Sequence, residues 1–160
     1  MERLLRSKLP RGAFDKVLAK HSNLMKRVRG RGNRTTELRL RSAMIQARLN
    51  GWKMHPESLV GHPDFYFPAL KLVVFVDGCF WHGCPKCGHV PSKHTEYWRA
   101  KFRRNRFRDQ KITSGLRTQG IMVIRFWEHD VQENLHSCIA AILGALRKQG
   151  QTAMIQRGQH

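Results

Sequence analysis

The stretch from Asp77 to Cys87 gathers reactive side chains of several chemical kinds. It holds a carboxylate, an imidazole, two adjacent aromatic rings and three thiols: Asp77, His82, Phe80 and Trp81, and Cys79, Cys84 and Cys87. It directly follows the apolar run 72–76, which predicts a buried strand. Reactive groups at the end of a buried strand project from a rigid edge of a sheet, so we expect the functional site here.

The three cysteines of this stretch have the spacing of a metal site. Cys84 and Cys87 form a Cys-x-x-Cys pair, and Cys79 adds a thiol upstream, so three sulfurs can surround a tetrahedral Zn²⁺. The fourth ligand is His129 if the strand 121–127 lies beside 71–76, and His89 is the local alternative. Four protein ligands leave no position for water, which predicts a structural zinc. A further cysteine, Cys138, lies in an apolar helical run, where a core position is expected.

Two carboxylates are candidates for a second metal ion. Asp64 opens one arm of a predicted hairpin and Asp77 ends the other, so both are expected at the same end of neighbouring strands. Mg²⁺ in phosphoryl-transfer sites binds one or two carboxylates, water and the substrate phosphate. Glu37 lies in the first turn of a predicted helix. Its two alternative roles are interaction with the helix terminus and contact with a metal ion or its water.

The elements that position these groups alternate between helix and strand. The patterns predict a helix from about residue 35 to Asn50, a hairpin of 64–67 and 71–76, a helix 95–119, a strand 121–127 and a helix from Asp130 to about Lys148. The first helix offers a buried face to the core through Leu38, Met44, Ile45 and Leu49. The fold class is therefore α/β, one domain with a mixed central sheet flanked by helices.

The helix 95–119 carries a carboxylate on its inward stripe. Asp109 belongs to a row of residues spaced three or four positions apart, whose other members are Trp98, Phe102, Asn105, Ile112 and Leu116. A carboxylate on a mostly apolar face needs a specific partner, and an ion pair to an arginine of the same helix is the simplest alternative.

The charge of the chain indicates a polyanionic partner. The 160 residues include 30 Lys and Arg against 11 Asp and Glu, a formal net charge of +19. Arginine predominates over lysine, which suits bidentate contacts to nucleic acid. Residues 1–34 are expected to form a basic arm on DNA, 35–148 the folded domain and 149–160 a tail. The chain shows neither a long apolar span nor the apolar core of a signal peptide, so no membrane contact and a cytoplasmic location are expected.

Several segments together resemble the very short patch repair (Vsr) endonucleases. The resemblance spans roughly residues 22 to 130 and rests on motifs in the family's order: Ser22 to Met25, Thr35 to Leu38, Pro63-Asp64, Gly78 to His82, Thr95 to Trp98, Asn105 to Asp109, and Val123 to Glu128. It implies a restriction-endonuclease-like fold and Mg²⁺-dependent incision of one DNA strand beside a T:G mismatch, the product of deaminated 5-methylcytosine. It also implies a monomer on double-stranded DNA, with mismatch-repair proteins as further partners.

The resemblance also assigns roles to residues. Asp64 would bind Mg²⁺, together with the backbone carbonyl of Val76. His82 would act as general acid or base, supported by Asp109, and Glu37 would lie near the metal waters. The residues expected to contact DNA are the aromatics Phe80, Trp81 and Trp98, which would wedge into the base stack, and Met25, Arg27, Arg29, Arg31 and Arg34 of the arm.

The chain departs from the best-known form of the family at several positions. Asp77 stands in place of a histidine, where it adds a candidate metal ligand; Cys84 stands in place of a histidine zinc ligand, and His129 in place of a cysteine. Two alternatives stay open. One is a restriction-type or nicking endonuclease without mismatch specificity, and the other is a non-catalytic zinc module that binds DNA.

Overall fold

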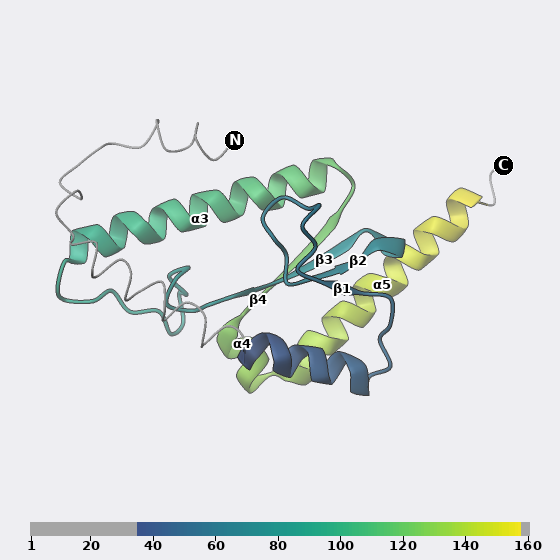
Figure 1. The fold of residues 1–160 in the computed structure, drawn as a ribbon, viewed down its shortest axis with the longest axis horizontal. Helices are drawn as coiled ribbons and strands as arrows, with labels where there is room; N and C mark the ends of the chain where they lie inside the picture. The colour runs from purple at the N-terminus through teal and green to yellow at the C-terminus, as the bar shows by residue number, and fades with distance from the viewer. Residues whose placement is uncertain (1–34, 158–160) are drawn as a thin grey trace. The chain divides into compact units, whose positions relative to one another are not determined.

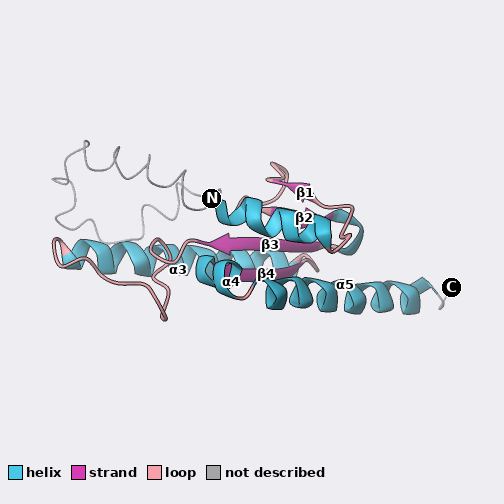
Figure 2. Ribbon diagram, turned by 90° about the horizontal axis from the view of Figure 1, so that it is seen from below, coloured by secondary structure: helices cyan, strands magenta, loops and turns pink. Residues whose placement is uncertain are grey.

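The computed structural model describes residues 35–157, with side chains described for 35–148. The chain forms a four-stranded sheet in the order β1-β2-β3-β4, with helices on both faces. The strands are β1 (Lys53–Met54), β2 (Phe65–Phe67), β3 (Leu72–Asp77) and β4 (Met122–Trp127). The first two pairings are antiparallel and β3 pairs with β4 in parallel, so the sheet is mixed, as expected (Figure 2).

The strand β3 is central and buried along its whole length. Its side chains alternate between two cores, because successive residues of a strand point to opposite faces. Leu72, Val74 and Val76 enter one core, and Val73 and Phe75 enter the other. The β-branched run therefore lies where the sequence predicted a strand covered on both sides.

The connection between β2 and β3 is a tight turn through the short 3-10 helix η1 (Pro68–Leu70). Pro68 begins η1, where the fixed φ of proline suits the first position of a helix. Lys71 closes the turn in a left-handed conformation with φ 46°. The register pairs Phe65 with Val74 and Phe67 with Leu72. The predicted hairpin is confirmed, and the short edge strand β1 is an addition that the sequence pattern did not indicate.

One face of the sheet is covered by the helix over residues 35–46, by α4 (Glu128–Glu133) and by α5 (Leu135–Arg157) (Figure 1). The helix over residues 35–46 packs through Leu40 and Met44, both fully buried. The expectation for Leu38 and Ile45 is wrong, because the stripe that faces the core runs through Leu40 and Met44 and leaves Leu38 and Ile45 exposed. Cys138 is buried in the same core, as expected.

The opposite face is covered by α3 (Thr95–Thr118), which Figure 1 shows across the sheet from α5. Its buried residues include Trp98, Phe102, Asn105 and Leu116. Leu116 joins Val73, Phe75 and Val123 in the second core. The predicted inward stripe of this helix is therefore confirmed.

The carboxyl-terminal helical region differs from the prediction in two ways. It is divided into α4 and α5, which meet at Asn134, rather than being one helix from Asp130. The helix α5 also continues to Arg157, past the expected end at Lys148, because the segment beyond consists mostly of residues with good helix propensity.

Some expectations concern residues outside the described part of the chain. The basic arm 1–34, with Met25, Arg27, Arg29, Arg31 and Arg34, lies there. Among the described residues, no helix is both long enough and apolar enough to cross a membrane.

Candidate active site and metal centre

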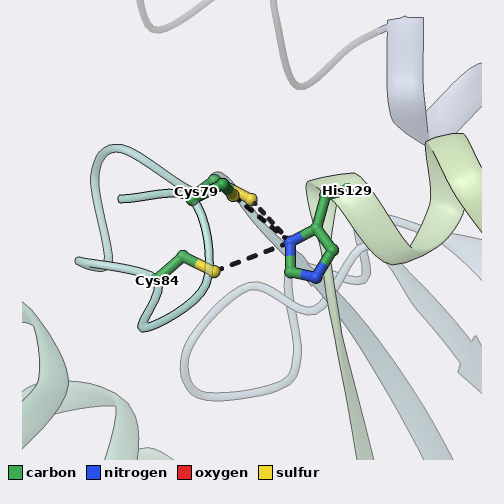
Figure 3. A group of neighbouring side chains, drawn as sticks. Cys79, Cys84 and His129 are labelled. Carbon is green, nitrogen blue, oxygen red and sulfur yellow. Dashed lines mark hydrogen bonds between the residues drawn. The ribbon is translucent and has the colours of Figure 1, made fainter. Parts of the chain in front are cut away.

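The three thiols of the loop after β3 gather around one histidine. Cys79, Cys84 and Cys87 place their sulfurs 3.2, 3.6 and 3.4 Å from Nδ1 of His129. Figure 3 shows the sulfurs of Cys79 and Cys84 pointing at this same ring nitrogen. Three thiolates and one imidazole are a donor set that suits tetrahedral Zn²⁺, so the chemistry of these residues fits the metal.

The histidine comes from the end of the parallel neighbour of β3. β4 ends at Trp127, and His129 lies in the first turn of α4, beside the loop that leaves β3. Its Nε2 lies 3.1 Å from a carboxylate oxygen of Asp130, which fixes the ring and leaves Nδ1 toward the sulfurs. The local alternative, His89, instead lies with its ring 5.8 Å from that of Phe80.

Backbone groups hold the thiol loop in shape. Burial acts to raise the pKa of Cys84, but hydrogen bonds from the backbone of Cys87 and Lys86 outweigh it and lower this pKa. Gly88 donates its N–H to the carbonyl of Cys84 at 2.9 Å. A Cβ at Gly88 would lie only 2.4 Å from that carbonyl oxygen, so the loop has no space for a side chain here.

A second group with metal-binding potential lies at the start of β2. Glu37, His55 and Asp64 bring one ligand atom each within 4.8 Å of one another. The helix over residues 35–46 supplies Glu37, and the residue after β1 supplies His55, whose N–H donates to the carbonyl of Asp64 at 3.2 Å. Nε2 of His55 lies 3.4 Å from the Glu37 carboxylate. Sequence reasoning missed His55, because only the pairing of β1 with β2 brings it to Asp64.

Asp64 is hydrogen-bonded to the end of β3, and its pKa is raised. The backbone N–H of Val76 donates to its carboxylate at 2.6 Å. Burial, reinforced by the negative charge of Glu37, raises the pKa of Asp64 from 3.8 to about 7. Such crowding of two carboxylates is relieved by a cation, so this donor set fits a divalent metal ion.

Asp77 does not join Asp64, in contrast to the expected convergence of the two carboxylates. Successive residues of β3 point to opposite faces, so the carboxylate of Asp77 lies on the α3 side. There Arg125 of β4 donates from Nε and Nη2 to both of its oxygens, at 2.7 and 2.6 Å. The described structure thus places Asp77 in an ion pair, outside the group formed by Glu37, His55 and Asp64.

His82 lies beside this ion pair and has a carboxylate partner of its own. Its Nδ1 is 2.5 Å from Oδ2 of Asp109 and 3.7 Å from Oδ1 of Asp77. Burial acts to raise the pKa of Asp109, but the hydrogen bond and charge of His82, with Arg125 and Arg108, outweigh it and lower this pKa. The inward carboxylate of α3 therefore has the specific partner that its position required.

The backbone next to His82 is anchored to α3. The side-chain amide of Asn105, itself 6% exposed, donates to the carbonyl of Trp81 at 2.6 Å. Asn105 and Asp109 lie one helical turn apart, so the same face of α3 fixes both the backbone before His82 and the imidazole ring. Asn105 and Arg125 are site residues that sequence reasoning did not single out. A polar side chain on the apolar stripe of α3 was the available signal for Asn105.

The aromatic residues of the loop pack against one another. The ring of Phe80 lies 5.1 Å from Trp81, 5.1 Å from Trp98 and 5.6 Å from Phe102, in edge-on arrangements. Phe80 and Trp81 are half-buried, whereas Trp98 is only 6% exposed. In this structure, Trp98 therefore supports the other two rings rather than presenting its own face.

Comparisons of the sequence with known proteins identify relatives of this chain. Residues 13–87 match the family model described as DNA mismatch endonuclease Vsr. The type II nicking enzyme V.NmeDIP of Neisseria meningitidis serogroup C is 39% identical over 118 residues, 71% of this chain and 78% of that protein. The DNA mismatch endonuclease Vsr of Escherichia coli (strain K12) is 33% identical over 106 residues, 64% of this chain and 67% of that protein.

A further relative matches over a shorter region. The type II nicking enzyme V.NaeI of Lentzea aerocolonigenes is 44% identical over 84 residues, and the chain spans about half (49%) of its length. A mixed α/β fold with these two groups of ligands and these relatives defines the class of DNA endonucleases. Within that class, the chain belongs to the Vsr family.

Proposed function

We propose that this protein nicks one strand of duplex DNA beside a T:G mismatch with the help of Mg²⁺, as in very short patch repair of deaminated 5-methylcytosine. The observation that carries the proposal is the end of β3, which joins two functional groups. The N–H of Val76 binds the carboxylate of Asp64 on one side, and Asp77 faces His82 and Asp109 on the other. The residues proposed to bind the metal and those proposed to transfer the proton are thus connected to one strand end.

Asp64 and Glu37 would hold the Mg²⁺, together with the backbone carbonyl of Val76. The ion would supply charge stabilisation at the scissile phosphate. The side chain of His55 is 53% exposed and lies at 3.4 Å from Glu37, so it can orient this carboxylate from the solvent side. Because its pKa is raised, Asp64 keeps its proton to a higher pH than an ordinary aspartate does in the metal-free protein. Metal binding would displace this proton.

His82 would transfer the proton to or from the attacking water or the leaving oxygen. The hydrogen bond of Nδ1 to Asp109 fixes one tautomer and leaves Nε2 for the reaction. Asn105 keeps the backbone before His82 in place. A zinc ion held by Cys79, Cys84, Cys87 and His129 would be structural, since its four positions are filled by protein.

Recognition of the mismatch would use the aromatic cluster. A mismatch scarcely changes the charge of DNA, so weaker stacking is the property that a protein can test. Phe80 and Trp81 are half-buried and offer ring surface at the loop, with Trp98 behind them. Lys101 places its ammonium group 5.1 Å from the centre of the Trp81 ring, which brings positive charge to the same surface.

A second candidate function is nicking of DNA without mismatch preference. It is favoured by the names of several relatives, which are type II nicking enzymes. Strand-resolved cleavage of matched and T:G duplexes of one sequence, with and without Mg²⁺, separates the two. We expect cleavage of one strand of the T:G duplex only, whereas equal cleavage of both duplexes would favour the second candidate.

Two substitutions test whether the chain is catalytic at all. Asp64→Ala and His82→Ala should abolish incision and retain DNA binding, because they remove chemistry rather than the basic surface. Glu57→Ala and His136→Ala are matched controls, since both residues are exposed. If Asp64→Ala leaves strand cutting unchanged, the catalytic assignment is wrong and the non-catalytic DNA-binding module gains support.

A further inference from the structure

One flank of α3 carries an exposed row of cationic and polar side chains. Their spacing of three or four residues places them on one side of the helix, next to the inward stripe. All are exposed: Arg99, Arg103, Arg106, Gln110, Ser114 and Arg117. The row extends along most of this 24-residue helix, which at 1.5 Å per residue is about 36 Å long.

A cavity of about 650 Å³ opens beside this row, between α3 and β4. Its lining includes the exposed residues Arg106, Gln110, Ser114 and Arg117 and the half-buried residues His82 and Asp109. We call this cavity the α3–β4 groove. It connects the exposed row to the imidazole that is proposed to transfer the proton.

The charges around the groove favour an anion. Arg99 pairs with Glu96, and the inner carboxylates of Asp77 and Asp109 are engaged by Arg125 and His82. Among the residues that the structure describes, Arg103, Arg106 and Arg117 have no acidic partner within ion-pair distance. Of these, Arg106 and Arg117 line the groove together with the hydroxyl of Ser114 and the amide of Gln110, and such groups are the donors that proteins direct at phosphate oxygens.

We propose that the α3–β4 groove binds the sugar–phosphate backbone of the DNA strand that leads to His82. This inference rests on the proposed function, because it takes the scissile phosphate to lie at His82. Arg106 and Arg117 are eleven positions apart, about 16 Å along the helix, so they contact different phosphates of one strand. The contacts fix the position of the strand and carry no base sequence information.

The test is the salt dependence of DNA binding by the full chain, without added divalent cation. Arg106→Gln with Arg117→Gln removes two phosphate contacts, so the slope of log affinity against log salt should become shallower by about 2. The matched control is Arg147→Gln with Lys148→Gln, which removes the same charge from exposed positions of α5. Fluorescence anisotropy of a labelled duplex, after thermal melts show equal folding, gives both slopes. A groove variant with the slope of the control would overturn the proposal.

A second measurement locates the contact on one strand. Methylphosphonate linkages, which are uncharged, replace the phosphates that flank the nick in either strand in turn. At contacted phosphates they should weaken binding by the wild type several-fold and leave the groove variant unaffected. Equal losses for both proteins in both strands would contradict the proposal. If the protein fails to nick DNA but the groove variant still shows the shallower salt slope, the proposed function is overturned and the groove proposal is not. The two failures are therefore distinguishable.

Discussion

At the scale of single residues, one half-buried cation, Arg125, organises the groups around His82. Arg125 makes a bidentate ion pair with Asp77, lies 3.5 Å from Asp109 and stacks over the ring of Phe75 at 4.4 Å. Asp77 is 8% exposed, so its carboxylate is bound by this partner rather than by bulk water. The residue that stands in place of the family's histidine thus has a structural explanation in its pairing with Arg125.

Removal of Arg125 should destabilise the protein more than removal of the whole pair. Arg125→Met leaves the buried carboxylate of Asp77 without its fork of donors, at a cost of about 3 to 5 kcal/mol. Arg125→Met with Asp77→Asn removes both charges and should recover most of this loss. Urea denaturation of the two variants and of Asp77→Asn measures the coupling. Additive effects would contradict the ion pair.

A pH dependence follows from the altered pKa of Asp64. Its folded-state pKa of about 7 lies above the ordinary 3.8, so the folded metal-free protein keeps a proton that the unfolded chain releases. The contribution of this group to stability is complete below about pH 4 and is lost as the pH rises through about 7. Between pH 5 and 8, the free energy of unfolding of the wild type should fall relative to Asp64→Asn, by on the order of 2 kcal/mol.

Urea denaturation at several pH values, without Mg²⁺, measures this difference. Glu57→Gln is the matched control, because it removes a carboxylate at an exposed position. A constant difference between wild type and Asp64→Asn over the whole pH range would contradict the raised pKa.

At the scale of elements, the end of β3 and the loop after it determine the site. The alternation of the strand separates Asp77 from the group that holds Asp64, and the loop returns its thiols to the first turn of α4. Residues 85–90 of this loop are exposed, so they add little to either core. Backbone contacts, such as the hydrogen bond from Gly88 to the carbonyl of Cys84, therefore shape the loop.

Glycine at position 88 is a requirement of the loop. Gly88→Ala would force a Cβ to within 2.4 Å of the Cys84 carbonyl oxygen and 2.7 Å of its backbone nitrogen, so the loop must open and metal binding should weaken by about tenfold or more. Gly144→Ala is the matched control, because a Cβ there meets no atom within 4 Å and alanine favours a helix by about 0.5 to 1 kcal/mol. Competition with a colorimetric zinc chelator measures both variants. Equal zinc affinity would contradict the account of the loop.

At the scale of the whole molecule, two features of composition occur in one chain. The net charge of +19 suits a polyanionic substrate, and the clustered thiols suit a metal that adds stability to a chain of this size. The sheet separates two cores, with the thiol loop at one end of β3 and β4.

Removal of zinc should therefore destabilise the whole domain. A chelator that takes Zn²⁺ should lower the melting temperature by several degrees or unfold the protein, because binding free energy of a structural zinc is folding free energy. Added Zn²⁺ should restore the melting temperature, and added Mg²⁺ should not. Cys84→Ser should behave as the chelated protein does. Metal analysis that finds no zinc in the folded, reduced protein would contradict this prediction.

Sequence patterns predicted the elements that depend on local spacing. The apolar run of β3, the inward stripe of α3 and the Cys-x-x-Cys pair are each contained in a short segment, so periodicity and spacing indicate them directly. The buried face of the first helix was misjudged at Leu38 and Ile45, because more than one stripe of that helix is apolar and only packing selects between them.

The sequence by itself determined the chemical classes present: a basic chain, a set of zinc-type ligands, and carboxylates with a histidine near a buried strand. The tertiary structure alone decided which of them meet. His129 rather than His89 joins the thiols, His55 joins Asp64, and Arg125 takes Asp77. The physical reason is that strand pairing and the alternation of side chains across a sheet bring together residues far apart in the chain, and no local pattern records that pairing.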